Sequence, residues 1–259
     1  MTEQRVISLE AVHNFRDYGA YPVAGGGRLR SGVLYRSAQH AGATVQDLET
    51  IAALGLATVI DFRGTKERAA HPCPRPPGFA AEVVAYEGET TGLPPHLQAE
   101  LAGLDAAGIR AMMAGIYRNL PMREGLLEML RRYFRALARH DGASLTHCVA
   151  GKDRTGMAVA LFHTALGVHP DDAMADYLLT NTAGNPEARL AAAAASVRRR
   201  YGRISDEALR TILSVAPDYL DAAFAAISQR HGSVDSFLET ALGVGPEIRE
   251  SLKARYLEA

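Results

Sequence analysis

One stretch decides the fold of this 259-residue chain: His147-Cys148-Val149-Ala150-Gly151-Lys152-Asp153-Arg154-Thr155-Gly156. A short run at 143–146 precedes it and the apolar run 157–162 follows it. This order predicts a strand, a tight loop and a buried helix, with the cysteine at the end of the strand. The five residues between Cys148 and Arg154 predict a ring of inward-pointing backbone N–H groups beside the positive N-terminus of the helix. Such a hollow fits a tetrahedral anion, with the sulfur atom at its floor.

The other residues of the stretch make the pattern more specific than a bare cysteine-to-arginine spacing, which is common by chance. Gly151 permits a positive φ or a close backbone approach, and Gly156 lets the helix pack tightly on the strand. Arg154 offers a planar, two-pronged donor to the hollow. The hydroxyl of Thr155 is placed where it could hydrogen-bond the sulfur. The alternative is a buried Cys148 in an ordinary strand-turn-helix connection.

The stretch resembles the signature of the cysteine-dependent phosphatases, H-C-x-x-G-x-x-R-[ST]. Its full form, HCVAGKDRTG, is most similar to the bacterial atypical tyrosine-protein phosphatases of the PtpB-like group. Three more stretches share that group's order: Asn14-Phe15-Arg16-Asp17, Val33-Leu34-Tyr35-Arg36-Ser37 and Thr58-Val59-Ile60-Asp61-Phe62-Arg63. The resemblance implies an α/β fold of the cysteine-phosphatase type, in which helices flank a central, mostly parallel sheet.

Composition is ordinary for a globular protein, with 47% hydrophobic and 22% charged residues. The formal net charge of −1 gives no support for binding nucleic acid or a membrane through bulk electrostatics. Two cysteines build no disulfide framework, so a reducing compartment and a free Cys73 thiol are expected. No signal peptide or membrane-length apolar run is visible. We therefore predict a cytoplasmic protein, although the resemblance leaves unconventional export open.

Apolar patterns along the chain predict one α/β domain over 1–259. Extended segments are expected at 6–9, 33–35, 56–60 and 82–86. Helices are expected from Thr44, with Asp47 as its capping partner, over 122–140 and after Pro170. An all-helical extension is expected over 186–259. The segment 87–121 is predicted to be a helical insertion, either a lid over the pocket or an ordinary pair of surface helices.

The loop predicts nucleophilic chemistry on a phosphate monoester. A helix N-terminus and nearby cations favour the thiolate of Cys148, which is a strong nucleophile and a good leaving group. Phosphoryl transfer depends mainly on positioning the phosphate and neutralising its oxygens. The residues expected to bind those oxygens are Val149, Ala150, Gly151, Lys152, Asp153 and Arg154. The product of attack is a phosphocysteine that water hydrolyses, and neither a metal nor a cofactor is expected.

Two aspartates compete for the role of the acid that protonates the leaving oxygen. Asp61 ends a predicted central strand, and the crevice of an open parallel sheet lies beyond the carboxyl ends of its strands. The sequence favours Asp61 for this reason, although it could instead bond Arg63 or the backbone. Asp153 lies within the loop itself, as in the myotubularin-like lipid phosphatases, and is the alternative.

Other polar residues have less specific predictions. Lys152 either adds a positive charge at the mouth, which could favour phosphoinositide head groups, or is a solvent-exposed loop lysine. His147 is expected to orient the loop by hydrogen bonding. Structural roles are favoured over pocket lining for three arginines: Arg16, Arg36 and Arg63.

The sequence therefore predicts a phosphatase acting on phosphotyrosine, with phosphoserine, phosphothreonine and phosphoinositides as further substrates to test. Its partners would be a phosphorylated protein or a phospholipid head group, and inorganic phosphate its product. A rhodanese-like sulfurtransferase is a second hypothesis, but the six-residue spacing from Cys148 to Arg154 and the presence of Asp61 argue against it. A phosphate-binding module without turnover is a third, which the intact Cys148, Arg154 and Thr155 disfavour.

Overall fold

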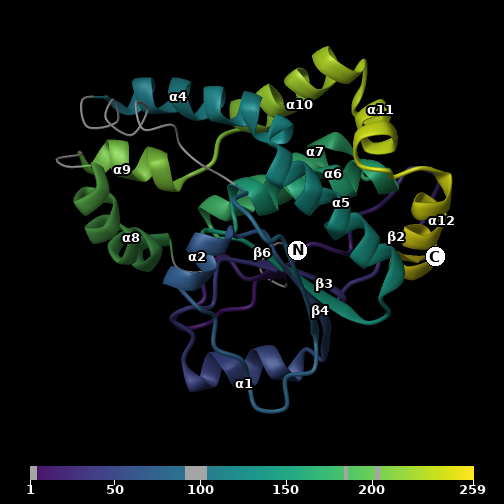
Figure 1. Cartoon of the computed structure of the whole chain (residues 1–259), viewed down its shortest axis with the longest axis horizontal. Helices are drawn as coiled ribbons and strands as arrows, with labels where there is room; N and C mark the ends of the chain where they lie inside the picture. Colours follow the sequence, from purple (N-terminus) through teal and green to yellow (C-terminus); the bar gives the residue numbers. More distant parts are fainter. Residues whose placement is uncertain (1–4, 91–103, 184–185, 202–204) are drawn as a thin grey trace.

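The computed structural model describes residues 5–90, 104–183, 186–201 and 205–259 (Figure 1). The strands are β1 (Arg16–Asp17), β2 (Arg28–Leu29), β3 (Leu34–Ser37), β4 (Leu56–Asp61), β5 (Glu82–Ala85), β6 (Ala143–His147) and β7 (Leu257–Glu258). The helices are α1 (Val45–Ala53), α2 (Thr65–Ala70), α4 (Ala106–Asn119), η3 (Leu120–Met122), α5 (Glu124–Arg139), α6 (Asp153–Leu166), α7 (Pro170–Leu178), η4 (Leu179–Asn181), α8 (Pro186–Tyr201), α9 (Asp206–Leu213), α10 (Pro217–His231), α11 (Val234–Ser236), η5 (Phe237–Ala241) and α12 (Pro246–Tyr256).

The central sheet has five strands in the order β1-β3-β6-β4-β5. All its pairs are parallel except β1 with β3, so the predicted mostly parallel sheet is confirmed. His147 at the end of β6 lies opposite Ser37 of β3 and Asp61 of β4. Three strands therefore end side by side where the loop of Cys148 begins, as expected for the active edge of an open α/β sheet.

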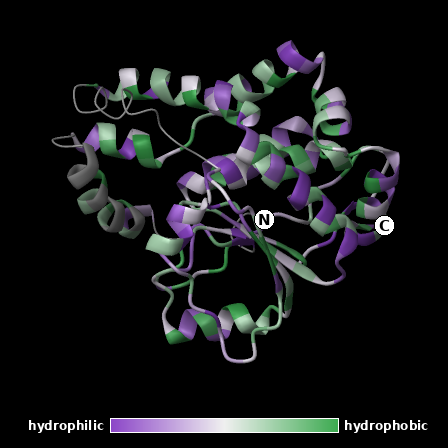
Figure 2. Cartoon of the chain, viewed as in Figure 1, coloured by the Kyte–Doolittle hydropathy of each residue, from purple (hydrophilic) through white to green (hydrophobic). Residues whose placement is uncertain are grey.

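Helices cover both faces of this sheet, with α1 on one face and α5 and α6 on the other, while α7 and α12 pack against these two and α4 lies further out against α9 and α10 (Figure 1). Successive residues of a strand point to opposite faces. Accordingly, Val59 of β4 packs with Ile51 of α1, whereas the next residue, Ile60, joins the larger core. Figure 2 shows both hydrophilic and hydrophobic colours along α1, which is typical of a helix with one solvent-exposed face.

The predicted start of α1 is confirmed. The Thr44 side chain accepts from the Asp47 N–H at 3.1 Å, and the Asp47 carboxylate accepts from the Thr44 N–H at 3.3 Å. The Asp47 carboxylate also accepts from the N–H groups of Glu10 and Ala11 at 2.7 and 2.9 Å. The capping residue therefore also fastens the N-terminal segment to the sheet's α1 face.

Two details of the predicted secondary structure are wrong. The C-terminal extension is not all helical, because β7 pairs antiparallel with β2 near the opposite end of the chain. A two-residue strand carries no periodicity that a sequence pattern could detect. The expected strand at 6–9 reduces to one bridge between Val6 and Arg16. Within the described ranges, no helix is long and apolar enough to cross a membrane.

The insertion predicted over 87–121 contains helix α4. Asp105 caps this helix by accepting from the Gly108 N–H at 2.8 Å, a cap that the sequence pattern had not indicated. Its buried residues are Ile109, Met113 and Tyr117, and it packs against α9 and α10. Residues 91–103 lie outside the described part of the chain. The lid and the single-domain organisation stay predictions.

Candidate active site

The loop between β6 and α6 forms the predicted hollow. Gly151 has φ +65°, and a Cβ atom there would collide with the Ser37 carbonyl and lie 2.7 Å from the Ala38 nitrogen. Only glycine fits this position, as the sequence predicted. Among the described residues, the N–H groups from Val149 to Lys152 donate to no other backbone oxygen. The loop therefore keeps a row of free donors beside the N-terminus of α6, which suits an anion.

Asn14 and Arg36, which belong to the N-terminal stretches 14–17 and 33–37, bond to the carbonyl groups of this loop. The Asn14 side chain donates to the carbonyls of Gly151 and Ala150 at 2.9 and 3.3 Å. Arg36 Nη2 donates to the same Gly151 carbonyl at 2.9 Å. Asn14 itself adopts φ +58°, an uncommon conformation that asparagine tolerates better than most residues. These contacts fix the carbonyls on the outside of the loop, so that its N–H groups stay turned inward.

Asp176 of α7 forms ion pairs with two buried arginines of these N-terminal stretches. Its Oδ1 accepts from Arg16 Nε at 3.3 Å, and its Oδ2 accepts from Arg36 Nη1 at 2.5 Å. Burial alone would raise the pKa of Asp176, but the charges of Arg16 and Arg36 outweigh it and lower the pKa to about 2. Burial and the charge of Arg36 lower the pKa of Arg16 to about 10. Arg36 therefore holds the loop directly through the Gly151 carbonyl, whereas Arg16 acts through Asn14, whose side chain bonds the same carbonyl. The favoured structural role fits both arginines.

Arg154 is held by the segment that follows β4 and by Thr90, which follows β5. Its Nη1 donates to the Phe62 carbonyl, to Thr90 Oγ1 and to Glu67 Oε2 at 3.0, 3.0 and 2.6 Å. Its Nη2 donates to Glu67 Oε1 at 2.9 Å. Within the described part of the chain, this leaves the Nε–H and the second Nη2 hydrogen without an acceptor. These two donors share one edge of the guanidinium, which can engage two oxygens of a phosphate.

Glu67 is the functional residue that the sequence reading missed, because helix α2 was not predicted. Its carboxylate also caps α2, accepting from the Gly64 N–H at 2.9 Å. The three-residue spacing from Gly64 to Glu67 is the signal that could have revealed it. Burial lowers the pKa of Arg154, but the charge of Cys148 and the Glu67 carboxylate outweigh it and raise the pKa above its ordinary value. The guanidinium is therefore a permanent charge facing the sulfur.

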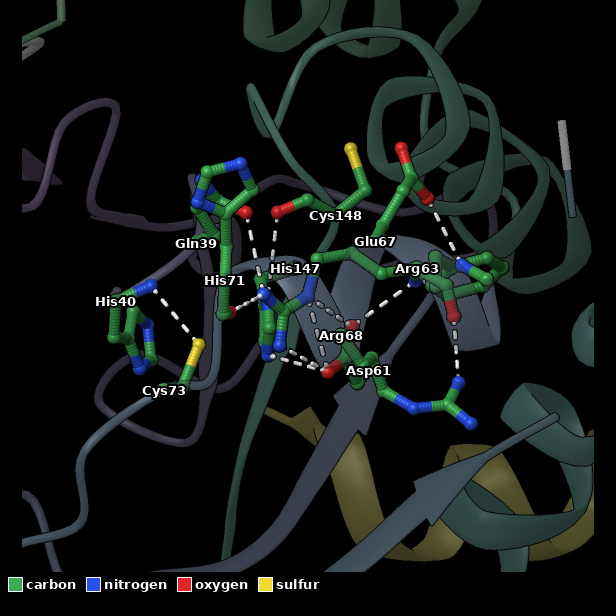
Figure 3. A network of polar contacts seen from close by, with 12 residues as sticks. Gln39, His40, Asp61, Arg63, Glu67, Arg68, His71, Cys73, His147 and Cys148 are labelled. Carbon is green, nitrogen blue, oxygen red and sulfur yellow. Dashed lines mark hydrogen bonds and ion pairs between the residues drawn. The ribbon is translucent and has the colours of Figure 1, made fainter. Parts of the chain in front are cut away.

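Asp61 lies at the strand end, as predicted, but in a closed ion pair. Its carboxylate accepts from the backbone N–H, Nε and Nη2 of Arg63 at 3.0, 2.9 and 2.8 Å, and its side chain is 2% exposed. Burial would raise its pKa, but His147 and the Arg63 hydrogen bonds lower the pKa to about 2. In Figure 3 the sulfur of Cys148 points away from Asp61. This geometry argues against the favoured assignment of Asp61 as the acid, because the carboxylate stays ionised.

Asp153 has a different environment in the first turn of α6. Its side chain is 29% exposed, and its Oδ1 accepts from the Tyr117 hydroxyl at 2.7 Å. Lys152 Nζ lies 3.3 Å from the same oxygen and also donates to the carbonyls of Ile212 and Ser214 at 2.7 and 3.0 Å. Lys152 is thus neither an exposed loop lysine nor a free charge at the mouth, because its ammonium group is hydrogen-bonded to carbonyl groups at the C-terminal end of α9.

The remaining candidates have supporting positions. Thr155 Oγ1 is buried and makes no hydrogen bond to Cys148 or to any other described residue, so the expected bond to the sulfur is not formed. His147 Nδ1 lies 3.4 Å from the Cys148 carbonyl, and its ring stacks on His40. Cys73 is a free thiol that accepts from the His40 N–H at 3.2 Å. No group of His, Cys, Asp or Glu within the described ranges could hold a metal ion.

The sequence model of the tyrosine phosphatase family matches residues 7–258. The chain belongs to this family. A Cupriavidus necator protein named as a tyrosine-protein phosphatase is 35% identical over 241 residues, which cover 92% of this chain and 84% of the relative. The triple specificity protein phosphatase PtpB of Mycobacterium tuberculosis is 29% identical over 270 residues, with 91% and 94% covered. The crystal structure of P. aeruginosa TpbA matches 75% of this chain and 96% of its own, with 18% identity and a TM-score of 0.32.

Membership confirms the resemblance seen in the sequence. This tyrosine phosphatase is a cysteine-dependent hydrolase of phosphotyrosine. The sulfurtransferase hypothesis loses its support, because the matched family is defined by phosphate-ester hydrolysis rather than sulfur transfer.

Proposed function

We propose that Cys148 is the nucleophile of this tyrosine phosphatase and that Asp153 is its general acid. The thiolate attacks the phosphorus of a phosphotyrosine, an S–P bond forms, and the P–O bond to the tyrosine breaks. Asp153 gives its proton to the leaving oxygen, so that tyrosine departs neutral. Water then attacks the phosphocysteine and gives a proton to the Asp153 carboxylate. The S–P bond breaks, which regenerates the thiolate and releases inorganic phosphate.

The geometry of the loop supports the binding half of this proposal. The free N–H groups from Val149 to Lys152 and the open edge of Arg154 supply donors to the three non-bridging oxygens. Asn14, Arg36 and Glu67 hold these donors in place before substrate arrives. Donors that need no reorganisation during the reaction are the most effective way to stabilise developing charge.

The contrast between the two aspartates is the observation that carries the proposed acid. The Asp61 side chain is 2% exposed and paired with Arg63, whereas the Asp153 side chain is 29% exposed and lies in the loop beside Cys148. A general acid must reach the leaving oxygen and exchange its proton with water in each cycle. The partial exposure of Asp153 and its position at the end of the loop support this role, and the buried pair with Arg63 supports a structural role for Asp61.

Substrate range forms the second part of the proposal. Phosphotyrosine in a protein is the primary substrate, and the triple specificity named for the M. tuberculosis relative supports testing phosphoserine, phosphothreonine and phosphoinositides. Lys152 gives no added preference for a phospholipid head group while its ammonium group is bonded to Ile212 and Ser214. A cytoplasmic location stays a prediction from the sequence.

The test is a panel of phosphotyrosine, phosphoserine and phosphothreonine peptides and phosphoinositides, assayed for phosphate release. Cys148→Ser is expected to abolish turnover on every member. Asp153→Asn is expected to lower kcat/KM for phosphotyrosine by roughly a hundred-fold or more, the usual contribution of a general acid. Asp61→Asn, assayed well below its unfolding temperature, should retain most of the turnover. Failure of the wild type on all phosphate monoesters would overturn the activity, and a larger loss for Asp61→Asn would return the acid to Asp61.

A further inference from the structure

Three tyrosines from three helices gather beside Asp153. The Tyr117 hydroxyl lies 2.7 Å from Asp153 Oδ1, and the Tyr177 hydroxyl lies 2.8 Å from the Tyr117 hydroxyl. The Tyr117 ring is fully buried and packs against Tyr177 and Tyr219 with centroids 6.3 and 5.5 Å apart. Tyr117 comes from α4, Tyr177 from α7 and Tyr219 from α10. The phenol is therefore held in one position by its neighbours.

Counting hydrogens fixes the direction of these two bonds. An ionised carboxylate only accepts hydrogen bonds, and a phenol has one hydrogen to donate. Tyr117 must give its hydrogen to Asp153, so Tyr177 must donate to Tyr117. Burial first, and then the charge of Asp153, raise the pKa of Tyr117 well above its ordinary value. Tyr117 therefore remains a neutral donor throughout the working pH range.

Both contacts to the Asp153 carboxylate fall on the same oxygen. Oδ1 receives the Tyr117 hydrogen and also lies 3.3 Å from Lys152 Nζ. Oδ2 has no partner among the described residues. When the carboxylate takes up a proton, Oδ1 already faces two donors, so the proton goes to Oδ2.

We infer that Tyr117 is a positioning residue for proton transfer, which occupies Oδ1 of Asp153 and thereby places the catalytic proton on Oδ2. The inference rests on the proposed role of Asp153 as the acid. It also gives helix α4 a part in the chemistry, because this helix of the insertion supplies the hydroxyl that sets the acid. Loss of that hydroxyl leaves only the 3.3 Å contact with Lys152 on Oδ1, so the carboxyl group rotates more freely and its proton is less confined to Oδ2.

The closing experiment uses substrates that differ in their need for an acid. A leaving oxygen of low basicity, as in p-nitrophenyl phosphate, departs without a proton, whereas phenyl phosphate requires one. Values of kcat/KM report the first chemical step and are free of phosphocysteine hydrolysis. Tyr117→Phe is expected to lower kcat/KM for phenyl phosphate by roughly ten-fold, part of the 10²–10⁴ that acid catalysis supplies. Its kcat/KM for p-nitrophenyl phosphate should change less than about two-fold.

Tyr219→Phe is the matched control, because it removes a hydroxyl from the same cluster that makes no bond to Asp153, and it should affect both substrates equally. Removing a donor to the charged form also favours the protonated acid. The alkaline limb of the pH profile of kcat/KM should therefore lie at higher pH in Tyr117→Phe than in the wild type. Equal losses on both substrates with an unmoved limb would overturn the inference.

Asp153→Asn, measured in the same series, separates the inference from the proposed function. A selective loss in Asp153→Asn without one in Tyr117→Phe leaves the acid standing and removes Tyr117 from the mechanism. No selective loss in Asp153→Asn overturns both. If Tyr117→Phe does not fold, Tyr177→Phe replaces it, since the Tyr117 phenol then loses the donor that fixes its orientation. A smaller selective loss is expected there, and its absence counts against the inference.

Discussion

Replacing Asp176 by asparagine tests how strongly the buried arginines depend on one carboxylate. Each Asp176 oxygen accepts from a different guanidinium, Oδ1 from Arg16 at 3.3 Å and Oδ2 from Arg36 at 2.5 Å. An asparagine has one acceptor oxygen, so its NH2 group must face one of the two guanidinium donors. Asp176→Asn therefore removes the charge that balances two buried cations and also creates a donor–donor clash.

The magnitude follows from the charges. The fall in the pKa of Asp176 from 3.8 to about 2 corresponds to about 2.5 kcal/mol of stability, since each pKa unit is worth about 1.4 kcal/mol. Loss of one partner from a buried ion pair typically costs about 3–5 kcal/mol, because the remaining charge stays buried. We therefore expect Asp176→Asn to lower the free energy of unfolding by about 3–5 kcal/mol at pH 7. A carboxyl group with a lowered pKa stabilises the fold above its unfolded pKa, so the difference should shrink as the pH falls from about 4 towards 2.

Urea unfolding at pH 7 and at pH 3 measures this free energy, and kcat/KM for phosphotyrosine reports the effect on the loop that Arg36 supports. Asp171→Asn is the matched control on the same helix, because its side chain is 93% exposed and it should change stability by less than about 0.5 kcal/mol. A loss below about 1 kcal/mol for Asp176→Asn, with unchanged kcat/KM, would refute the idea that this carboxylate organises the loop.

Two further substitutions test the clamp and the packing of the loop. Glu67→Gln replaces the charged acceptor of Arg154 by an amide, and kcat/KM for phosphotyrosine should fall by about ten- to a hundred-fold, since a charged hydrogen bond contributes about 1.5–3 kcal/mol. An unchanged kcat/KM would show that Arg154 needs no clamp. Gly156→Ala places a Cβ atom 2.8 Å from the Tyr177 ring, so the unfolding free energy should fall by about 1–3 kcal/mol in urea titrations. A gain in stability would contradict the close packing described here.

Features set by short-range sequence were predictable. The need for glycine at 151, the capping pair Thr44 and Asp47, and the strand that ends at Asp61 all depend on residues a few positions apart. Backbone conformation responds to this local information through φ preferences, capping bonds and hydrophobic periodicity. The parallel sheet followed from the same patterns and from the family resemblance.

Features set by contacts between distant segments were not predictable. Arg154 meets Glu67 across 87 positions, and Tyr117 meets Asp153 across 36. No periodicity links such pairs, because they depend on how helices pack on the finished sheet. Asp61 is a different case, because its partner Arg63 lies only two positions away. The sequence placed Asp61 at the strand end and offered both an acid and a bond to Arg63, but it did not decide between them.

Four polar groups of the loop and of the first turn of α6 are anchored to different parts of the chain. Asn14 and Arg36 hold the Gly151 carbonyl, and Glu67 holds the guanidinium of Arg154. Helix α4 contacts Asp153, while the end of α9 contacts Lys152. Because separate anchors constrain neighbouring residues, the loop cannot relax around a bound phosphate without breaking several bonds together. The donors are thus organised before the reaction begins, and the groups that organise them lie outside the ten-residue signature, from Asn14 to the end of α9.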